Sequence, residues 1–127
     1  MPIVTTIDVK KKLIIHVARG KIPFSEIKET MDALLQNPDY DPSFNSLWDF
    51  YEAVTEKFHI WQIKELAQYI KEFAAKKKTR RKIAYVTKNP YHYGLIRMFL
   101  VFVENEFIDT GIYQERNEAL DWLNEEL

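Results

Sequence analysis

The chain has 127 residues and no cysteine, and its 18 basic and 19 acidic side chains leave a net charge of −1. This length predicts one domain, residues 1–127, and the lack of cysteine excludes disulfides, thiolate-held zinc and a cysteine nucleophile. With 46% hydrophobic and 14% aromatic residues, the chain is too apolar to be disordered, and its near-neutral charge argues against a dedicated nucleic-acid binder. The N-terminus lacks a signal-peptide pattern and no apolar run reaches about 18 residues, so we expect a cytoplasmic protein without stable membrane insertion.

The first part of the chain predicts a hairpin, a helix and a third strand. Apolar residues alternate over 3–9 and 13–18 with a short lysine-rich connection between them, which predicts two antiparallel strands. Over 24–36 the apolar positions recur at helical spacing, and an Asn-Pro pair ends the pattern. The segment 44–50 returns to strand-like composition.

The second part of the chain alternates helices and strands. Helices are predicted over 60–74, 91–104 and 115–127, and strands over 83–87 and 107–113. The element order is therefore ββαβαβαβα, with five strands and four helices. Such alternation predicts an α/β fold whose mixed sheet is mainly parallel, with one antiparallel strand added by the hairpin.

Four short sequence words carry a resemblance to a known family. They are LWD at 47–49, IAYV at 83–86, YGLIRM at 93–98 and ALDWL at 119–123. In this order and spacing the chain resembles, over essentially its whole length, a bacterial SpoIIAA-like/STAS-like domain family. That fold is shared by STAS domains and by the lipid-binding Sec14 (CRAL-TRIO) domain.

The resemblance implies a non-catalytic regulatory or protein-interaction domain, with no cofactor and with a partner protein that the sequence does not identify. The alternative that it implies is a Sec14-like carrier of lipid or another apolar ligand. In the anti-sigma-antagonist branch of the family, an Asp-Ser-Ser-Gly stretch before the second helix holds a phosphorylatable serine. The matching stretch here, 57–60, is Lys-Phe-His-Ile, and the nearest hydroxyl is Thr55. The resemblance therefore does not extend to a serine switch, and phosphorylation of Thr55 stays open.

The carboxyl ends of the parallel strands form the first candidate site, because ligands of open α/β sheets bind there, near helix N-termini. A small anionic ligand could be held there by the third helix N-terminus and by a guanidinium. In the competing interpretation Asn89 only caps the helix and Arg97 pairs with an acidic side chain. The candidate ligand-binding residues are Asp49, Tyr51, Lys88, Asn89, His92, Tyr93 and Arg97.

Other features give less support for chemistry. The histidines, His16, His59 and His92, have no metal-binding spacing, and His16 alternates within a strand as a structural histidine would. No serine has the setting of a nucleophile, so we expect neither a metal site nor an enzyme. The basic run 76–82 ends a helix, where the dipole favours cations, so we expect a solvated loop rather than a nucleic-acid site.

The third predicted helix is apolar over more of its circumference than one sheet face can cover. Either neighbouring helices cover the surplus, or the helix forms a subunit interface. A twofold homodimer is the commonest closed assembly, and its interface would be rich in apolar residues. The edge assigned to this interface is formed by Ile96, Leu100 and Val103.

Overall fold

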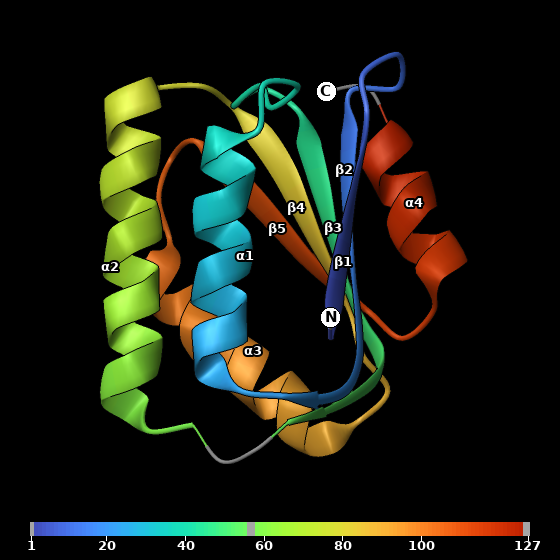
Figure 1. Ribbon diagram of the computed structural model, residues 1–127, viewed down its shortest axis with the longest axis vertical. Coiled ribbons are helices and arrows are strands. Elements are labelled where there is room, and N and C mark those ends of the chain that lie inside the picture. The colour runs from blue at the N-terminus through green and yellow to red at the C-terminus, as the bar shows by residue number, and fades with distance from the viewer. Residues whose placement is uncertain (1, 56–57, 126–127) are drawn as a thin grey trace.

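The structure, a computed structural model, describes residues 2–55 and 58–125 and has the predicted order ββαβαβαβα (Figure 1). Within these residues a mixed five-stranded sheet is flanked by four helices, which confirms the predicted fold class. The elements are β1 (Ile3–Asp8), β2 (Leu13–Ile22), α1 (Phe24–Gln36), β3 (Asn45–Thr55), α2 (Ile60–Lys77), β4 (Arg81–Val86), α3 (Pro90–Val103), β5 (Ile108–Tyr113) and α4 (Arg116–Asn124).

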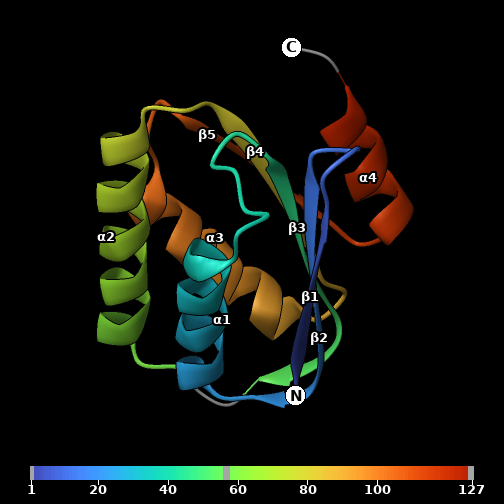
Figure 2. The same cartoon turned by 45° about the horizontal axis from the view of Figure 1, so that its top comes forward.

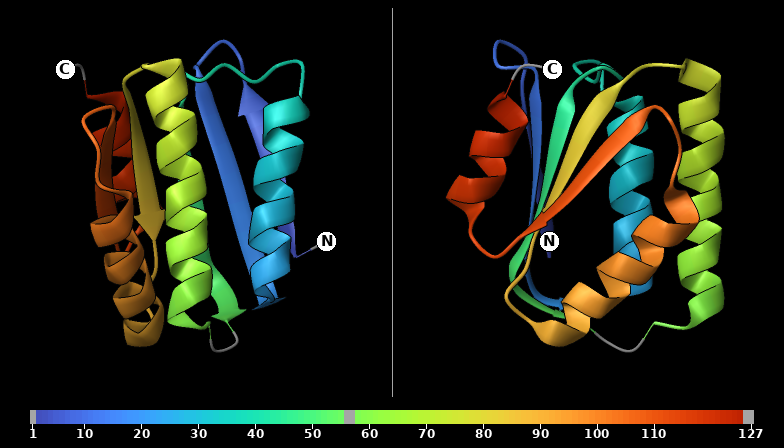
Figure 3. Two further views of the ribbon diagram at one scale, coloured as in Figure 1. Left: turned by 90° about the vertical axis from the view of Figure 1, so that its left-hand side faces the viewer. Right: turned by 180° about the vertical axis from the view of Figure 1, so that it is seen from behind.

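The strands stand in the sheet in chain order, β1-β2-β3-β4-β5. The first pair is antiparallel, and β2 to β5 are parallel to one another. The helices α1, α2 and α3 follow three successive parallel strands and lie on one face, while α4 lies on the other (Figures 1 and 2). Figure 3 shows α2 between α1 and α3 over that face.

Two strands are longer than the sequence pattern predicts. The strand β2 runs on to Ile22 and β3 to Thr55, past a register shift between Val17 and Arg19. In this extension Arg19 pairs with Glu52 at 2.7 Å, and both side chains are exposed. Because most of these residues face solvent, their hydrophobicity gives no period-two signal.

The two faces of the sheet have separate cores. The core under the three helices includes Ile22, Trp48 and Ile83, and the core under α4 is built around Leu47 and Ala84. The nine-residue helix α4 packs mainly on β3, β4 and β5. The residues of β1 that face the α4 side are therefore open to solvent, and Val4 is 53% exposed.

The basic run does not behave as one solvated loop. Lys76 and Lys77 end α2, but the strand β4 begins at Arg81, and Lys82 is only 4% exposed. The Lys82 Nζ donates hydrogen bonds to the backbone oxygens of Trp122, at 2.9 Å, and Glu125, at 2.7 Å. These are carbonyls at the C-terminal end of α4, which carry negative partial charge. The expectation of a solvated face is therefore wrong for Lys82, which ties β4 to α4.

Candidate ligand-binding cavity

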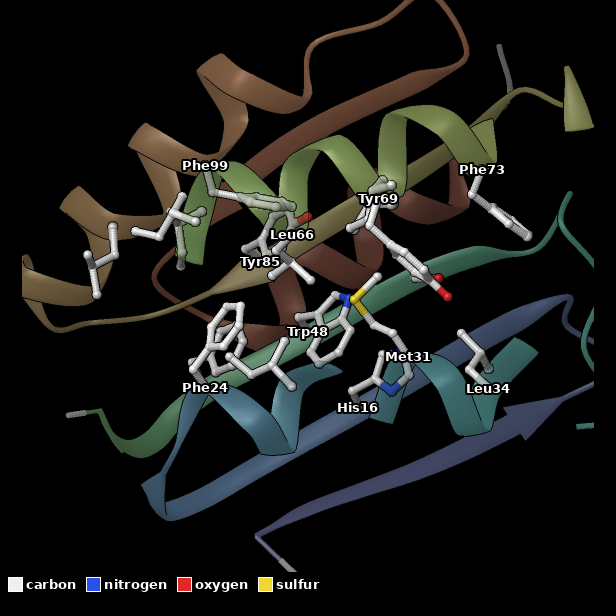
Figure 4. A pocket seen from close by; sticks show the side chains of 18 of the residues that line it. His16, Phe24, Met31, Leu34, Trp48, Leu66, Tyr69, Phe73, Tyr85 and Phe99 are labelled. Atoms are coloured by element: carbon white, nitrogen blue, oxygen red, sulfur yellow. The ribbon is translucent and has the colours of Figure 1, made fainter. Parts of the chain in front are cut away.

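An apolar cavity of about 130 Å³ lies between the sheet and the three helices on one face (Figure 4). Its floor comes from β2, β3 and β4, and its walls come mainly from α1, α2 and α3. Most of the lining is aliphatic or aromatic. Residues that line it include Phe24, Met31, Leu34, Leu66, Tyr69, Phe73, Leu95, Ile96 and Phe99 from the helices.

Three rings that carry polar atoms at their edges lie in a row across the floor. In the sheet register Thr5, His16, Trp48 and Tyr85 stand side by side across β1 to β4. The imidazole of His16 stacks on the indole of Trp48, with ring centroids 3.9 Å apart. Beyond this row, Phe99 of α3 meets the Tyr85 ring edge-on. Aromatic rings therefore form much of the floor.

His16 is fully buried, with 0% of its surface exposed. One ring nitrogen, Nδ1, shares a hydrogen bond of 2.7 Å with Thr5 Oγ1. The other, Nε2, has no hydrogen-bond partner in the described part of the chain. Burial, together with the positive charge of Arg81, lowers the pKa of His16 from 6.5 to about 3, so the ring is neutral near pH 7.

The neutral His16 should make the domain sensitive to acid. The unfolded chain takes up the His16 proton near pH 6.5, whereas the folded chain resists it down to about pH 3. Stability present above pH 6.5 is therefore lost as the pH falls through this window, by about 1.4 kcal/mol per pH unit for one group. Burial lowers the pKa of His92 in the same direction, so the wild-type response contains both histidines.

The variant His16→Phe separates the two contributions, because phenylalanine keeps a ring on Trp48 but takes up no proton. Between pH 7 and pH 4.5, urea unfolding should show a loss of stability about 2–3 kcal/mol smaller in the variant than in the wild type. Equal losses in both proteins would mean that His16 is protonated in the folded state.

The residues proposed from the sequence at the strand ends do not form one cluster. The Asp49 carboxylate lies 3.5 Å from Arg116 of α4, and Asp49 also accepts the backbone N–H of Tyr51 at 3.0 Å. The Arg97 guanidinium instead donates to the Tyr93 hydroxyl at 3.3 Å. Asp49 and Tyr51 line a hollow on the α4 side, together with Arg116.

The other residues that the sequence predicts at the strand ends have separate contacts. Asn89 caps α3 by accepting the backbone N–H groups of Tyr91 and His92, at 2.8 and 3.4 Å. The Lys88 Nζ lies 4.0 Å from the centre of the Tyr51 ring. Of the predicted residues only His92, which is 4% exposed, lines the apolar cavity. Lys57, in the stretch that matches the family's phosphorylation segment, lies outside the described residues.

The edge of α3 that the sequence predicts as a dimer interface packs mostly against the core of its own domain. Ile96 and Val103 are 9% and 3% exposed and belong to the core under the helices, and Leu100 is half-buried against that core. The helix α3 packs against α2, which covers its flank. A dimer surface made of these three residues does not fit this packing, whereas dimerisation itself stays a prediction.

The cavity gives a further reason for the apolar surplus of α3. The sequence predicts a neighbouring helix or a second subunit over this surplus, and in the structure Leu95, Ile96 and Phe99 also line the cavity. His16, Trp48 and Tyr85 share the helix-covered face of the sheet, and their polar edges were the sign that this core is not purely hydrophobic.

Neither a metal centre nor a membrane-spanning helix is found in the residues that the structure describes. Within 2–55 and 58–125, no group of three or more histidine and acidic side chains could hold a metal ion. Over the same residues, every helix is too short or too polar to cross a bilayer.

Comparison with known proteins identifies the fold. No family model and no curated protein matches the sequence. A solved structure that is similar to this chain is that of an uncharacterised protein from Shewanella loihica PV-4, of the DUF3478 family, with a SpoIIAA-like fold. The match has a TM-score of 0.59 and 20% sequence identity, and it covers 95% of this chain and 93% of the other. The chain therefore has the SpoIIAA-like fold, as its sequence words and element order predicted.

Proposed function

We propose that this domain binds a small apolar molecule in the cavity between the sheet and α1, α2 and α3. The observation that carries the proposal is the cavity itself, about 130 Å³ in volume and lined almost wholly by aliphatic and aromatic side chains. Engineered protein cavities of about 150 Å³ with similar lining take up benzene. The cavity thus has room for the body of a small ligand built on one ring system.

Binding of a small apolar molecule is the function of a ligand carrier. A carrier is the alternative that the resemblance implies beside a regulatory or interaction domain. The proposed carrier differs from a Sec14-like carrier in the size of the ligand. Pockets for drug-sized ligands have volumes of about 300–1,000 Å³, several times the volume found here. A lipid with two acyl chains therefore does not fit this arrangement of the helices.

The lining favours a ligand with at least one polar atom. Trp48 and Phe99 line the cavity with aromatic rings that a ring or chain can contact, while the buried Nε2 of His16 lacks a partner in the described residues. A buried polar atom without a hydrogen bond is costly, and a ligand group that bonded to it would remove that cost.

Indole is a suitable first probe, because it combines one ring system with one hydrogen-bond donor. We expect saturable shifts in the NMR signals of the Trp48 indole and of backbone amides around the cavity. Leu66→Phe narrows the cavity and should weaken binding at least about tenfold. Leu120→Phe, the same change at a half-buried position in the core under α4, should leave binding unchanged.

Two outcomes would contradict the proposal. One is the absence of saturable binding by indole and by benzene. The other is binding that Leu120→Phe weakens and Leu66→Phe does not, because the probe would then lie on the α4 side.

A further inference from the structure

Arg81 stands at one end of the cavity and has no acidic partner among the described residues. Its side chain lines the cavity and is half-buried, at the amino end of β4. The guanidinium Nη1 donates a hydrogen bond of 3.3 Å to the hydroxyl of Tyr40, which also lines the cavity. The described ion pairs of the arginines are Arg19 with Glu52 and Arg116 with Asp49. A guanidinium has five N–H donors, so most of those on Arg81 are available.

The charge of Arg81 acts on two rings that line the cavity. Burial raises the pKa of Tyr85, and the Arg81 charge acts against that rise. The same charge adds to the effect of burial in lowering the pKa of His16. Both rings lie on the cavity floor, so the field of the guanidinium reaches into the apolar space. This field favours an anionic group and disfavours a cationic one.

Two further polar groups lie on the same face of the sheet. Ser46 is 3% exposed, lines the cavity and stands beside Ile83, which is two residues along β4 from Arg81. His16 Nε2 is buried and has no hydrogen-bond partner in the described residues. Along β2, His16 is the next helix-facing residue after Ile14, which pairs with Ser46 of β3. The polar groups thus extend from the charged end of the cavity toward its centre.

We propose that the ligand is a small apolar acid whose carboxylate binds the Arg81 guanidinium and the Tyr40 hydroxyl. Its apolar body lies over Trp48 and between the helix side chains. The inference rests on the proposed function and adds the chemical class and the orientation of the ligand. It places the charged group at the amino ends of the parallel strands, opposite to the end that the sequence suggested.

A matched pair of probes tests the charge separately from the apolar body. The acid 3-phenylpropanoate and the alcohol 3-phenylpropan-1-ol share a ring and chain and differ in the carboxylate. At pH 7 the wild-type protein should bind the acid about 10- to 100-fold more tightly in NMR titrations, as expected for a charge-assisted hydrogen bond. The Arg81 Nε–H signal should shift with the acid and not with the alcohol.

Two substitutions in adjacent residues locate the charge that is responsible. Arg81→Met keeps an unbranched stem and should lower the affinity for the acid about 10- to 100-fold, while changing that for the alcohol less than about threefold. Arg80→Met is the control, because the Arg80 side chain is exposed and donates to the backbone oxygen of Glu106. It should leave both affinities unchanged. If Arg81→Met does not fold, the Nε–H shift and the acid-to-alcohol ratio of the wild type decide the question.

The outcomes separate the two proposals. Binding of the alcohol with equal or weaker binding of the acid would overturn the acid inference and leave the cavity function standing. Failure of both probes, together with failure of indole, would overturn the cavity function itself. An acid preference that Arg80→Met removes and Arg81→Met retains would place the carboxylate outside the cavity.

Discussion

Replacing Trp48 by alanine is expected to lower the free energy of unfolding by about 3–5 kcal/mol. The indole is only 8% exposed and stacks between the rings of His16 and Phe50, at centroid distances of 3.9 and 5.9 Å. Alanine would remove these contacts and leave a void beside an existing cavity, which the stiff sheet cannot close by moving. Urea unfolding monitored by circular dichroism measures the loss.

The other tryptophans provide graded controls. Trp61, at the start of α2, is 60% exposed, so Trp61→Ala should change stability by less than about 0.5 kcal/mol. Trp122 of α4 is half-buried beside Tyr113, so its loss should fall between the two. A loss below about 1 kcal/mol for Trp48→Ala would contradict the packing described for the floor of the cavity.

Replacing Lys82 by methionine is expected to cost about 2–3 kcal/mol of stability. Methionine keeps the unbranched apolar stem but removes the Nζ donor from the backbone oxygens of Trp122 and Glu125. Hydrogen bonds from a charged donor contribute about 1.5–3 kcal/mol each, and the relief of a buried ammonium offsets part of the loss. The matched control is Lys76→Met, at an exposed position in the last turn of α2, which should be nearly neutral.

Hydrogen exchange can locate this effect. In Lys82→Met, the amides of α4 should exchange faster than in the wild type, while those of α1 should change only by the global loss of stability. Uniform acceleration in both helices would mean that Lys82 acts on the whole domain and not on the end of α4. An unchanged midpoint would show that the two carbonyls find other partners without the ammonium.

The fold was predictable because its elements have strong and different periods. The hairpin alternates at period two on both sides of a short lysine-rich connection, and α1 ends at an Asn-Pro pair. The ends of β2 and β3 are not predictable from the hydrophobic pattern, because backbone pairing, from Arg19 with Glu52 to Ile22 with Thr55, continues where the side chains are mostly exposed. A hydrophobic pattern in the sequence indicates which residues are buried. It indicates backbone pairing between strands only where the paired residues are also buried.

The cavity was not predictable in the same way. The strand-end rule pointed to Asp49 and Arg97, but Asp49 pairs with Arg116, and Arg97 turns to Tyr93. An empty volume depends on how far apart the helices stand over the sheet, and no local spacing of residues encodes that separation. The half-buried position of Arg81 and the buried position of Lys82 are not predictable for a related reason, because a run of basic residues does not show which of its members point inward.

The order of the strands in the sheet has a consequence for how the chain can fold as it is made. Each strand after β1 joins the sheet beside the strand that precedes it in sequence. No strand has to be inserted between two that are already paired, so the sheet can grow at one open edge as synthesis proceeds from the amino end. The cavity floor is complete once β4 has emerged, and α3 then closes it from above. The last helix to emerge, α4, covers the opposite face, so the side that holds the cavity can form before the chain is finished.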